Sequence, residues 1–204
     1  MGAAEVLADP REASVEAMFE AAGALRRGHF ALKSGSHSDR YLEKFAVLQY
    51  PTLAVEIGRR LAESLRAHDP TLVVGPTTGG VLLAFETARH LQEGLGHTVR
   101  GIFAEPAGVG QRALRRGWPI DGDDRIVLVD DILTSGASLR ETVEAVATAG
   151  GRPLAATVIV DRSVDAVDVG VPLGALARIE IASWEADGCP LCSAGVTLEK
   201  PGSS

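Results

Sequence analysis

Hydrophobic residues change their spacing along the chain, and the changes predict an order of helices and strands. Residues 12–27 and 51–65 place apolar side chains three and four positions apart, which predicts two amphipathic helices. Between them, residues 29–44 carry short apolar stretches separated by Ser-Gly-Ser-His-Ser-Asp. That pattern predicts a hairpin or two short strands. The first third of the chain is therefore expected to hold a small β element between two helices.

After residue 70 the predicted elements alternate regularly. Their order is strand 72–74, helix 81–91, strand 99–103, strand 126–129, helix 138–149 and strand 154–160. The strands are nearly continuous aliphatic runs, as expected where a parallel sheet is buried on both faces. The pattern therefore predicts an α/β fold, with a mostly parallel sheet flanked by helices. At 204 residues, the chain is expected to form one domain.

Residues 104–122 interrupt this alternation. The segment contains four glycines and two prolines, together with Arg112, Arg115 and Arg116, and shows neither a strand pattern nor a long helical period. A loop of this length inside a compact domain is usually functional or disordered. The segment is therefore expected to lack strands.

Composition and charge narrow the possible partners. The formal net charge of −7 argues against broad attraction to nucleic acid or to acidic lipid. The longest apolar runs are far shorter than a bilayer span, and the N-terminus lacks a basic segment followed by an apolar one. We therefore expect a cytoplasmic protein with small-molecule substrates and with no nucleic-acid or membrane partner.

Two predicted strands end in stretches that suit a phosphate group. In the first, VVGPTTGG (73–80), a strand leads through glycines into a helix, where backbone N–H groups and the hydroxyls of Thr77 and Thr78 favour an anion. The same glycines also suit an ordinary tight connection between a strand and a helix. The stretch is neither a GxGxxG motif nor a Walker loop, so both interpretations remain open.

The second stretch combines acidic and phosphate-binding features. Asp130 and Asp131 follow the predicted strand 126–129, and a loop rich in hydroxyl groups leads into the next helix. Carboxylates accept hydrogen bonds and repel phosphate, whereas hydroxyls and amides at a helix start bind it. A ribose phosphate satisfies both halves, with its hydroxyls on the acids and its phosphate in the loop. The alternative is that one aspartate only caps the following segment.

Three stretches carry a resemblance to a known family. LVDDILTSGAS (128–138) resembles the phosphoribosyl-pyrophosphate (PRPP) binding motif of type I phosphoribosyltransferases. GHFALKSGSHSDRYLEK (28–44) resembles the N-terminal signature of the orotate phosphoribosyltransferase family, and VDR (160–162) matches its strand-terminal arginine. Together these stretches span residues 28–162. The resemblance implies an N-terminal helix and small hood strands in residues 1–50, a core in residues 51–165 and a C-terminal extension in residues 166–204.

The resemblance implies that the chain transfers phosphoribosyl from PRPP to orotate in pyrimidine synthesis, with Mg²⁺ as cofactor. Acids 130 and 131 would hold the ribose hydroxyls, the following loop would hold the 5′-phosphate, and the earlier loop would hold pyrophosphate. The residues assigned to PRPP are Asp130, Asp131, Ile132, Leu133, Thr134, Ser135, Gly136, Ala137, Ser138, Thr77, Thr78, Gly79, Gly80 and Lys33. Those assigned to orotate are Thr134, Arg162, Lys33, Tyr41 and Leu42.

The resemblance also gives residues 104–118 the role of a closing lid that reaches the neighbouring subunit of a homodimer with shared active sites. Glu105-Pro106 stands where family members often have an Arg-Lys pair. The lid's positive charge is therefore assigned to Arg112, Arg115 and Arg116, which count as catalytic candidates with Asp130 and Asp131, although a solvated basic turn is the alternative. Two other functions remain open: a transferase for another nitrogen heterocycle, and a PRPP-sensing regulator.

Cys189 and Cys192 form a CxxC pair outside these motifs. The pair resembles half of a zinc site, which two copies could complete across a dimer with four sulfurs. A pair of free thiols or a redox element is the more common alternative. The five histidines show no metal-ligand spacing. His37 is assigned to the base site, and His29, His68, His90 and His97 are expected at the surface or in turns.

Overall fold

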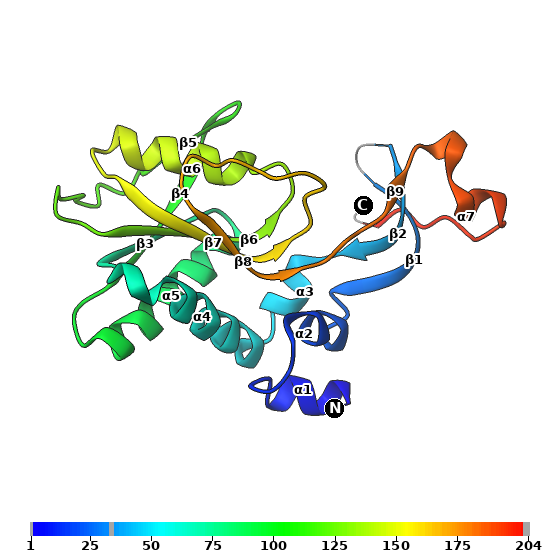
Figure 1. Ribbon diagram of the computed structural model, residues 1–204, viewed down its shortest axis with the longest axis horizontal. Helices are drawn as coiled ribbons and strands as arrows, with labels where there is room; N and C mark the ends of the chain where they lie inside the picture. The colour runs from blue at the N-terminus through cyan, green and yellow to red at the C-terminus, as the bar shows by residue number, and fades with distance from the viewer. Residues whose placement is uncertain (1, 33–34, 202–204) are drawn as a thin grey trace.

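The computed structural model describes residues 2–32 and 35–201 and contains two β-sheets (Figure 1). The larger sheet has the strand order β5-β4-β3-β6-β7-β8. All of its neighbouring strands are parallel except β5, which is antiparallel to β4. The strands are β3 (Leu72–Pro76), β4 (Arg100–Gly108), β5 (Gln111–Ala113), β6 (Ile126–Leu133), β7 (Pro153–Asp161) and β8 (Leu173–Arg178). The predicted α/β class with a mostly parallel sheet is confirmed.

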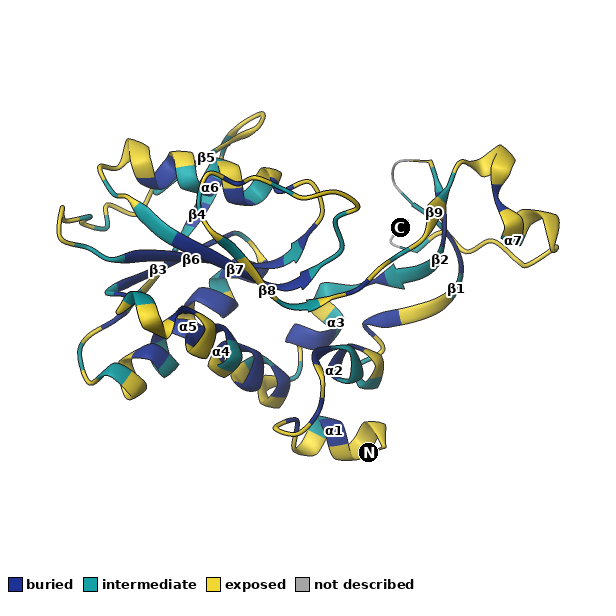
Figure 2. Ribbon diagram, in the orientation of Figure 1, coloured by how far each residue is buried: buried dark blue, intermediate teal, exposed yellow. Residues whose placement is uncertain are grey.

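Helices cover both faces of this sheet. Alternate strand residues point to opposite sides, so each face packs against its own set of helices. Val73 and Val127 pack in the cluster that includes residues of α4 (Pro51–Leu65) and α5 (Gly79–Leu95). Leu128 packs on the other side, with residues of α6 (Ala137–Thr148). The central strands are consequently buried along most of their length (Figure 2). Helix α4 has the bounds that its hydrophobic period predicts.

A small antiparallel sheet stands at one end of the larger one (Figure 1). It consists of β1 (Leu25–Ala31), β2 (His37–Leu42) and β9 (Ser183–Trp184), so the predicted β element in residues 29–44 is confirmed. The chain beyond residue 165 supplies β8 to the large sheet and β9 to the small one. The division into three segments and a single domain stays a prediction. The remaining short elements are α1 (Ala3–Ala8), α2 (Val15–Ala21), α3 (Lys44–Leu48), η1 (Arg66–His68), η2 (Ala186–Gly188) and α7 (Pro190–Ser193).

The first predicted helix is shorter than its sequence pattern suggested. Helix α2 ends at Ala21, and the chain turns at Gly23, where φ is +67°. Leu25 then begins β1 and pairs with Leu42. Leu25 fits the helical spacing, but its tertiary partner is a strand. Hydrogen bonding across the hairpin therefore overrides the local period.

The prediction that residues 104–122 lack strands is wrong for the first half of the segment. Strand β4 continues to Gly108, and β5 returns antiparallel to it. Gly110, with φ of +66°, lies in the turn between them. This hairpin lies at the edge of the sheet and alternates partly buried with exposed positions, so it carries no aliphatic run by which a buried strand is recognised.

Within residues 2–32 and 35–201, every helix is either too short or too polar to cross a bilayer.

Leu128 offers a test of the core packing. Its side chain is fully buried in the central strand β6, so Leu128→Ala should lower the free energy of unfolding by about 2–5 kcal/mol. Urea unfolding followed by circular dichroism measures the change. Val55→Ala on α4 is the control, because Val55 is 38% exposed and should cost much less. Equal losses in the two variants would contradict the assigned core.

Candidate active site

A cavity of about 740 Å³ lies between the ends of β6 and β7 and the small sheet. Ligands of open parallel sheets bind beyond the carboxyl ends of the strands, and this cavity occupies that position. Both sheets contribute to its lining. The lining residues include Tyr41, Leu42, Lys44, Asp131, Ile132, Thr134, Ser138, Arg162 and Lys200.

The acid pair lies within β6 rather than after it, which corrects the predicted strand end at residue 129. Strand β6 continues to Leu133 but pairs with β3 only through Leu128, so its last residues extend past β3. Asp130 and Asp131 are 7% and 3% exposed. The Asp131 N–H donates to Asp130 Oδ1 at 2.8 Å, and the Ile132 N–H donates to Asp131 Oδ1 at 2.7 Å.

Two adjacent buried carboxylates repel each other, and the structure reduces this cost in two ways. Lys44 Nζ lies 2.9 Å from Asp131 Oδ2 and compensates that charge. Burial, reinforced by the neighbouring charge of Asp131, raises the pKa of Asp130 to about 7. Asp130 can therefore carry a proton near neutral pH. The pair can thus accept hydrogen bonds from a diol and, when Asp130 is protonated, also donate one.

The first predicted phosphate loop packs directly against the acid pair. A Cβ atom on Gly79 would lie 2.2 Å from Asp131 Oδ2, so only glycine allows the helix start to approach this carboxylate. A Cβ atom on Gly80 would lie 2.8 Å from Pro76 Cδ, in the preceding strand. Helix α5 begins at Gly79, so the start of this helix lies beside Asp131. The earlier predicted phosphate loop and the acid pair are therefore neighbours through Gly79 and Asp131.

The second predicted phosphate loop connects β6 to α6. Gly136 adopts φ of +76° immediately before the first residue of α6, and a Cβ atom there would lie 2.4 Å from Val167 Cγ1. Arg140 Nη2 donates to the Ser135 carbonyl at 2.6 Å and fixes the loop from behind. Thr134 and Ser138 line the cavity. The start of a 12-residue helix therefore faces the space next to the acids, as an anion site requires.

The predicted acceptor side lies across the same cavity. Arg162 Nε donates to Thr134 Oγ1 at 3.0 Å, and the Arg162 N–H donates to the Leu133 carbonyl. Burial lowers the pKa of Arg162, because the guanidinium has lost part of its water. An incoming carboxylate would replace that water. Tyr41 and Leu42 line the cavity from β2, whereas Lys33 lies outside the described residues.

The three arginines of the predicted lid occupy different environments. Arg112 Nη1 lies 3.3 Å from Thr77 Oγ1 and 3.2 Å from the Ala104 carbonyl, and its Nε is 3.3 Å from Glu141. Arg116 forms an ion pair with Glu105 at 2.7 Å, and Arg115 is exposed. Of the three, only Arg112 contacts a predicted phosphate loop in this structure.

Lys44 and Lys200 are cavity residues that the sequence analysis did not single out. Lys44 is the last residue of the N-terminal signature (28–44), so its place in that stretch could have indicated a role in the site. Lys200 carries no motif and reaches the cavity because the C-terminal segment returns along β1, where the Ala31 N–H donates to the Glu199 carbonyl. That approach depends on tertiary structure alone.

Cys189 and Cys192 lie away from the cavity lining, beside His29 and His37. His29 is 2% exposed, so the prediction that it is a surface or turn histidine is wrong. Its ring is enclosed by the C-terminal segment, which has no sequence signal that pairs it with β1.

The fold and the site together define a type I phosphoribosyltransferase. The family model described as phosphoribosyl transferase domain matches residues 46–184. A solved orotate phosphoribosyltransferase from Aeropyrum pernix superimposes with a TM-score of 0.56 at 25% identity, covering 80% of this chain and 93% of that one.

The sequence relatives specify the branch of the family. The orotate phosphoribosyltransferase of Pelotomaculum thermopropionicum is 41% identical over 189 residues, which is 93% of this chain and 96% of that protein. The one from Caldanaerobacter subterraneus subsp. tengcongensis is 39% identical over 186 residues, which is 91% of this chain and 94% of that protein. The chain belongs to the orotate phosphoribosyltransferase family, whose members are pentosyltransferases.

The protonation of Asp130 predicts a pH-dependent stability. Its pKa rises from 3.8 to about 7, so between these values the native state binds more protons than the unfolded state. The free energy of unfolding should therefore fall as pH rises from about 4 to 7. Asp130→Asn removes this loss and should be more stable than the wild type at pH 8, by up to about 4 kcal/mol, and similar to it at pH 4.

Urea unfolding at several pH values measures this difference. Asp123→Asn is the matched control, because Asp123 is exposed and should leave the pH profile unchanged. A profile for Asp130→Asn that follows the wild type throughout would contradict the raised pKa.

Proposed function

We propose that this chain transfers the phosphoribosyl group of 5-phosphoribosyl 1-diphosphate to orotate. The products are orotidine 5′-phosphate and pyrophosphate, a step of de novo pyrimidine (UMP) biosynthesis. The proposal rests above all on Asp131, which lines the cavity together with Thr134 and Ser138 of one helix-start loop and lies against Gly79 of the other. One ligand with a diol between two phosphate groups satisfies all three features.

In this proposal the donor lies along the carboxyl end of β6. Asp130 and Asp131 accept hydrogen bonds from the ribose hydroxyls. Residues 132–138 bind the 5′-phosphate through backbone N–H groups and the hydroxyls of Thr134, Ser135 and Ser138. Residues 77–80 bind the pyrophosphate. Because Gly79 touches Asp131, both ends of the donor are held around the same carboxylate.

The proposed reaction breaks the bond between the anomeric carbon and pyrophosphate. Positive charge builds on the ribose ring and negative charge on the leaving group, as in other glycosyl transfers. Stabilisation is therefore mainly electrostatic. Arg112 is the lid cation best placed for it, because its guanidinium already contacts the Thr77 hydroxyl. Arg115 and Arg116 keep their predicted lid role only if the hairpin rearranges, since Arg116 is paired with Glu105.

The oxygen donors of the site suit Mg²⁺, the proposed cofactor. Asp131 lines the cavity and Asp130 precedes it in β6, and the small hard cation binds through one or two carboxylates together with substrate oxygens. Asp130 and Asp131 would hold it through the ribose side of the donor. When bound, it would supply charge neutralisation for the departing pyrophosphate.

The acceptor is proposed to bind opposite the acids. Arg162 offers a planar donor pair to the orotate carboxylate, for which guanidinium is better suited than ammonium. Tyr41 and Leu42 supply an apolar surface for the ring, and Thr134 lies between the acceptor and the phosphate loop. Lys33 is kept as a predicted contact to either ligand. The homodimer with shared active sites also stays a prediction.

An activity assay tests the function. Purified protein with Mg²⁺, PRPP and orotate should consume orotate, which is followed by its ultraviolet absorbance. Arg162→Lys should raise KM for orotate at least about tenfold while leaving KM for PRPP nearly unchanged, because one charge-assisted hydrogen bond is lost. Turnover of another nitrogen heterocycle but not orotate would overturn the proposed acceptor. PRPP binding without turnover of any base would favour a sensor.

The lid arginines give a second comparison. Arg112→Ala should lower kcat about 10²-fold, the size expected for one preorganised donor to a developing anion. Arg115→Ala is the matched control on the same segment and should change kcat little in comparison, because Arg115 is exposed, whereas Arg112 contacts Thr77. Steady-state kinetics at saturating PRPP measure both. A larger loss in the Arg115 variant would place the acting cation there instead.

A further inference from the structure

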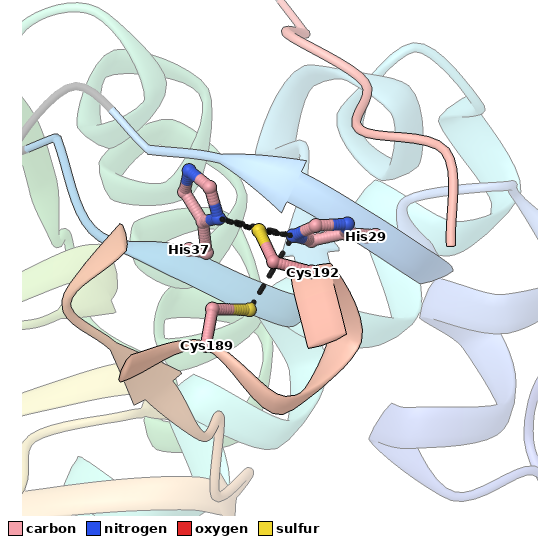
Figure 3. A group of neighbouring side chains, drawn as sticks. All are labelled: His29, His37, Cys189 and Cys192. Atoms are coloured by element: carbon pink, nitrogen blue, oxygen red, sulfur yellow. Dashed lines mark hydrogen bonds between the residues drawn. The ribbon is translucent and has the colours of Figure 1, made fainter. Parts of the chain in front are cut away.

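Four side chains capable of binding a metal converge beside the small sheet, outside the lining of the active-site cavity. His29 comes from β1, His37 from β2, Cys189 directly precedes α7, and Cys192 lies within it (Figure 3). One nitrogen or sulfur atom from each lies within 4.8 Å of the others. Among the described residues, no other group of three or more such side chains comes together in this way.

The distances match the edges of a small tetrahedron. His29 Nε2 and His37 Nδ1 are 3.0 Å apart. Cys192 Sγ lies 3.3 Å from His37 Nδ1 and 3.7 Å from His29 Nε2, and Cys189 Sγ lies 3.4 Å from His29 Nε2. Tetrahedral zinc, with bonds of about 2.0 Å to nitrogen and 2.3 Å to sulfur, requires edges of roughly 3.3 to 3.8 Å. The observed edges agree to within a few tenths of an ångström.

The hydrogen bonding of His29 prepares it to be a ligand. Its Nδ1 lies 2.8 Å from the Val196 carbonyl, and a carbonyl oxygen can only accept. Nδ1 therefore carries the proton, and the lone pair of Nε2 points at the other three side chains. Metal-binding histidines are commonly oriented by such a bond from the second ring nitrogen. The carbonyl thus fixes both the tautomer and the ring direction that a metal needs.

We propose that His29, His37, Cys189 and Cys192 bind one Zn²⁺ ion within a single chain. Two thiolates and two imidazoles are a common ligand set of structural zinc sites, and four protein ligands leave no position for a substrate. The site replaces the four-sulfur site across a dimer that the sequence suggested, because two imidazoles of the same chain complete the set. A disulfide between the cysteines would leave the convergence of both imidazoles unexplained.

The zinc site joins the C-terminal segment to the hairpin of β1 and β2. Apart from the ion, the segment is held to the small sheet by the pairing of β9 with β2 at two positions, by backbone hydrogen bonds of Glu199 with His29 and Ala31, and by the ion pair of Arg26 with Glu199. The next residues, Lys200 and Pro201, line the active-site cavity. The ion therefore fixes the path by which the C-terminal segment reaches that cavity, and its role is structural.

Metal analysis of the untagged full-length protein tests the proposal directly. Mass spectrometry of the metals should find about one zinc ion per chain, falling to near zero in Cys192→Ser and in His37→Gln. His68→Gln is the matched control, because His68 lies in η1, outside the cluster, and should retain full zinc. Protein loaded with Co²⁺ should show the visible bands of a tetrahedral site and a thiolate charge-transfer band.

Further outcomes distinguish the alternatives independently of catalysis. Chelation should lower the midpoint of thermal unfolding and make both thiols reactive, and added Zn²⁺ should reverse both effects. Wild-type zinc content no higher than that of Cys192→Ser would overturn the proposal. So would a Cys189–Cys192 disulfide in the purified protein, detected as a mass loss of two hydrogens. Neither outcome depends on whether orotate is the acceptor.

Discussion

The active site depends on keeping two adjacent carboxylates buried at the end of a central strand. Burial makes their mutual repulsion costly, and an anion-binding loop packs against them with no room for a side chain at Gly79. Lys44 compensates one carboxylate, and a raised pKa lets the other hold a proton. The arrangement is unfavourable for the empty protein, and a ligand that offers hydroxyl groups to the acids relieves it. The ligand proposed for this site, a ribose between two phosphates, offers hydroxyl groups of this kind.

The large sheet carries the two carboxylates, and the small sheet lines the cavity beside them. The acids lie near the end of β6, and the two predicted phosphate loops follow the neighbouring strands β3 and β6 of the parallel sheet, at the edge where ligands of such sheets bind. Tyr41, Leu42 and Lys44 come from the small sheet and the residues after it. The chain beyond β8 leaves the large sheet, adds β9 to the small one and returns along β1 to the cavity. A metal centre on the small sheet would stabilise this return path without touching the substrate.

Much of the fold could be predicted because buried elements leave strong local patterns. Helix α4 shows a regular apolar period. Strands β6 and β7 contain aliphatic runs, as expected for strands that are covered on both faces. Elements at the edge leave weaker patterns. The hairpin of β4 and β5 is largely polar, and Leu25 fits both a helix and a strand. In both places backbone pairing with another strand decided the structure, and the spacing of apolar residues does not show that pairing.

The proposed donor half of the site could be read from the sequence, because Asp130, Asp131 and the two glycine-containing loops lie in short contiguous stretches with recognisable chemistry. The cations near it follow from tertiary contacts alone: Lys44 reaches Asp131, Arg112 reaches Thr77, and Arg116 is paired with Glu105. The tertiary structure also brought His29 and His37 to two cysteines more than 150 residues away along the chain. Residues that are distant in sequence meet through strand pairing and chain return, and their spacing carries no trace of it.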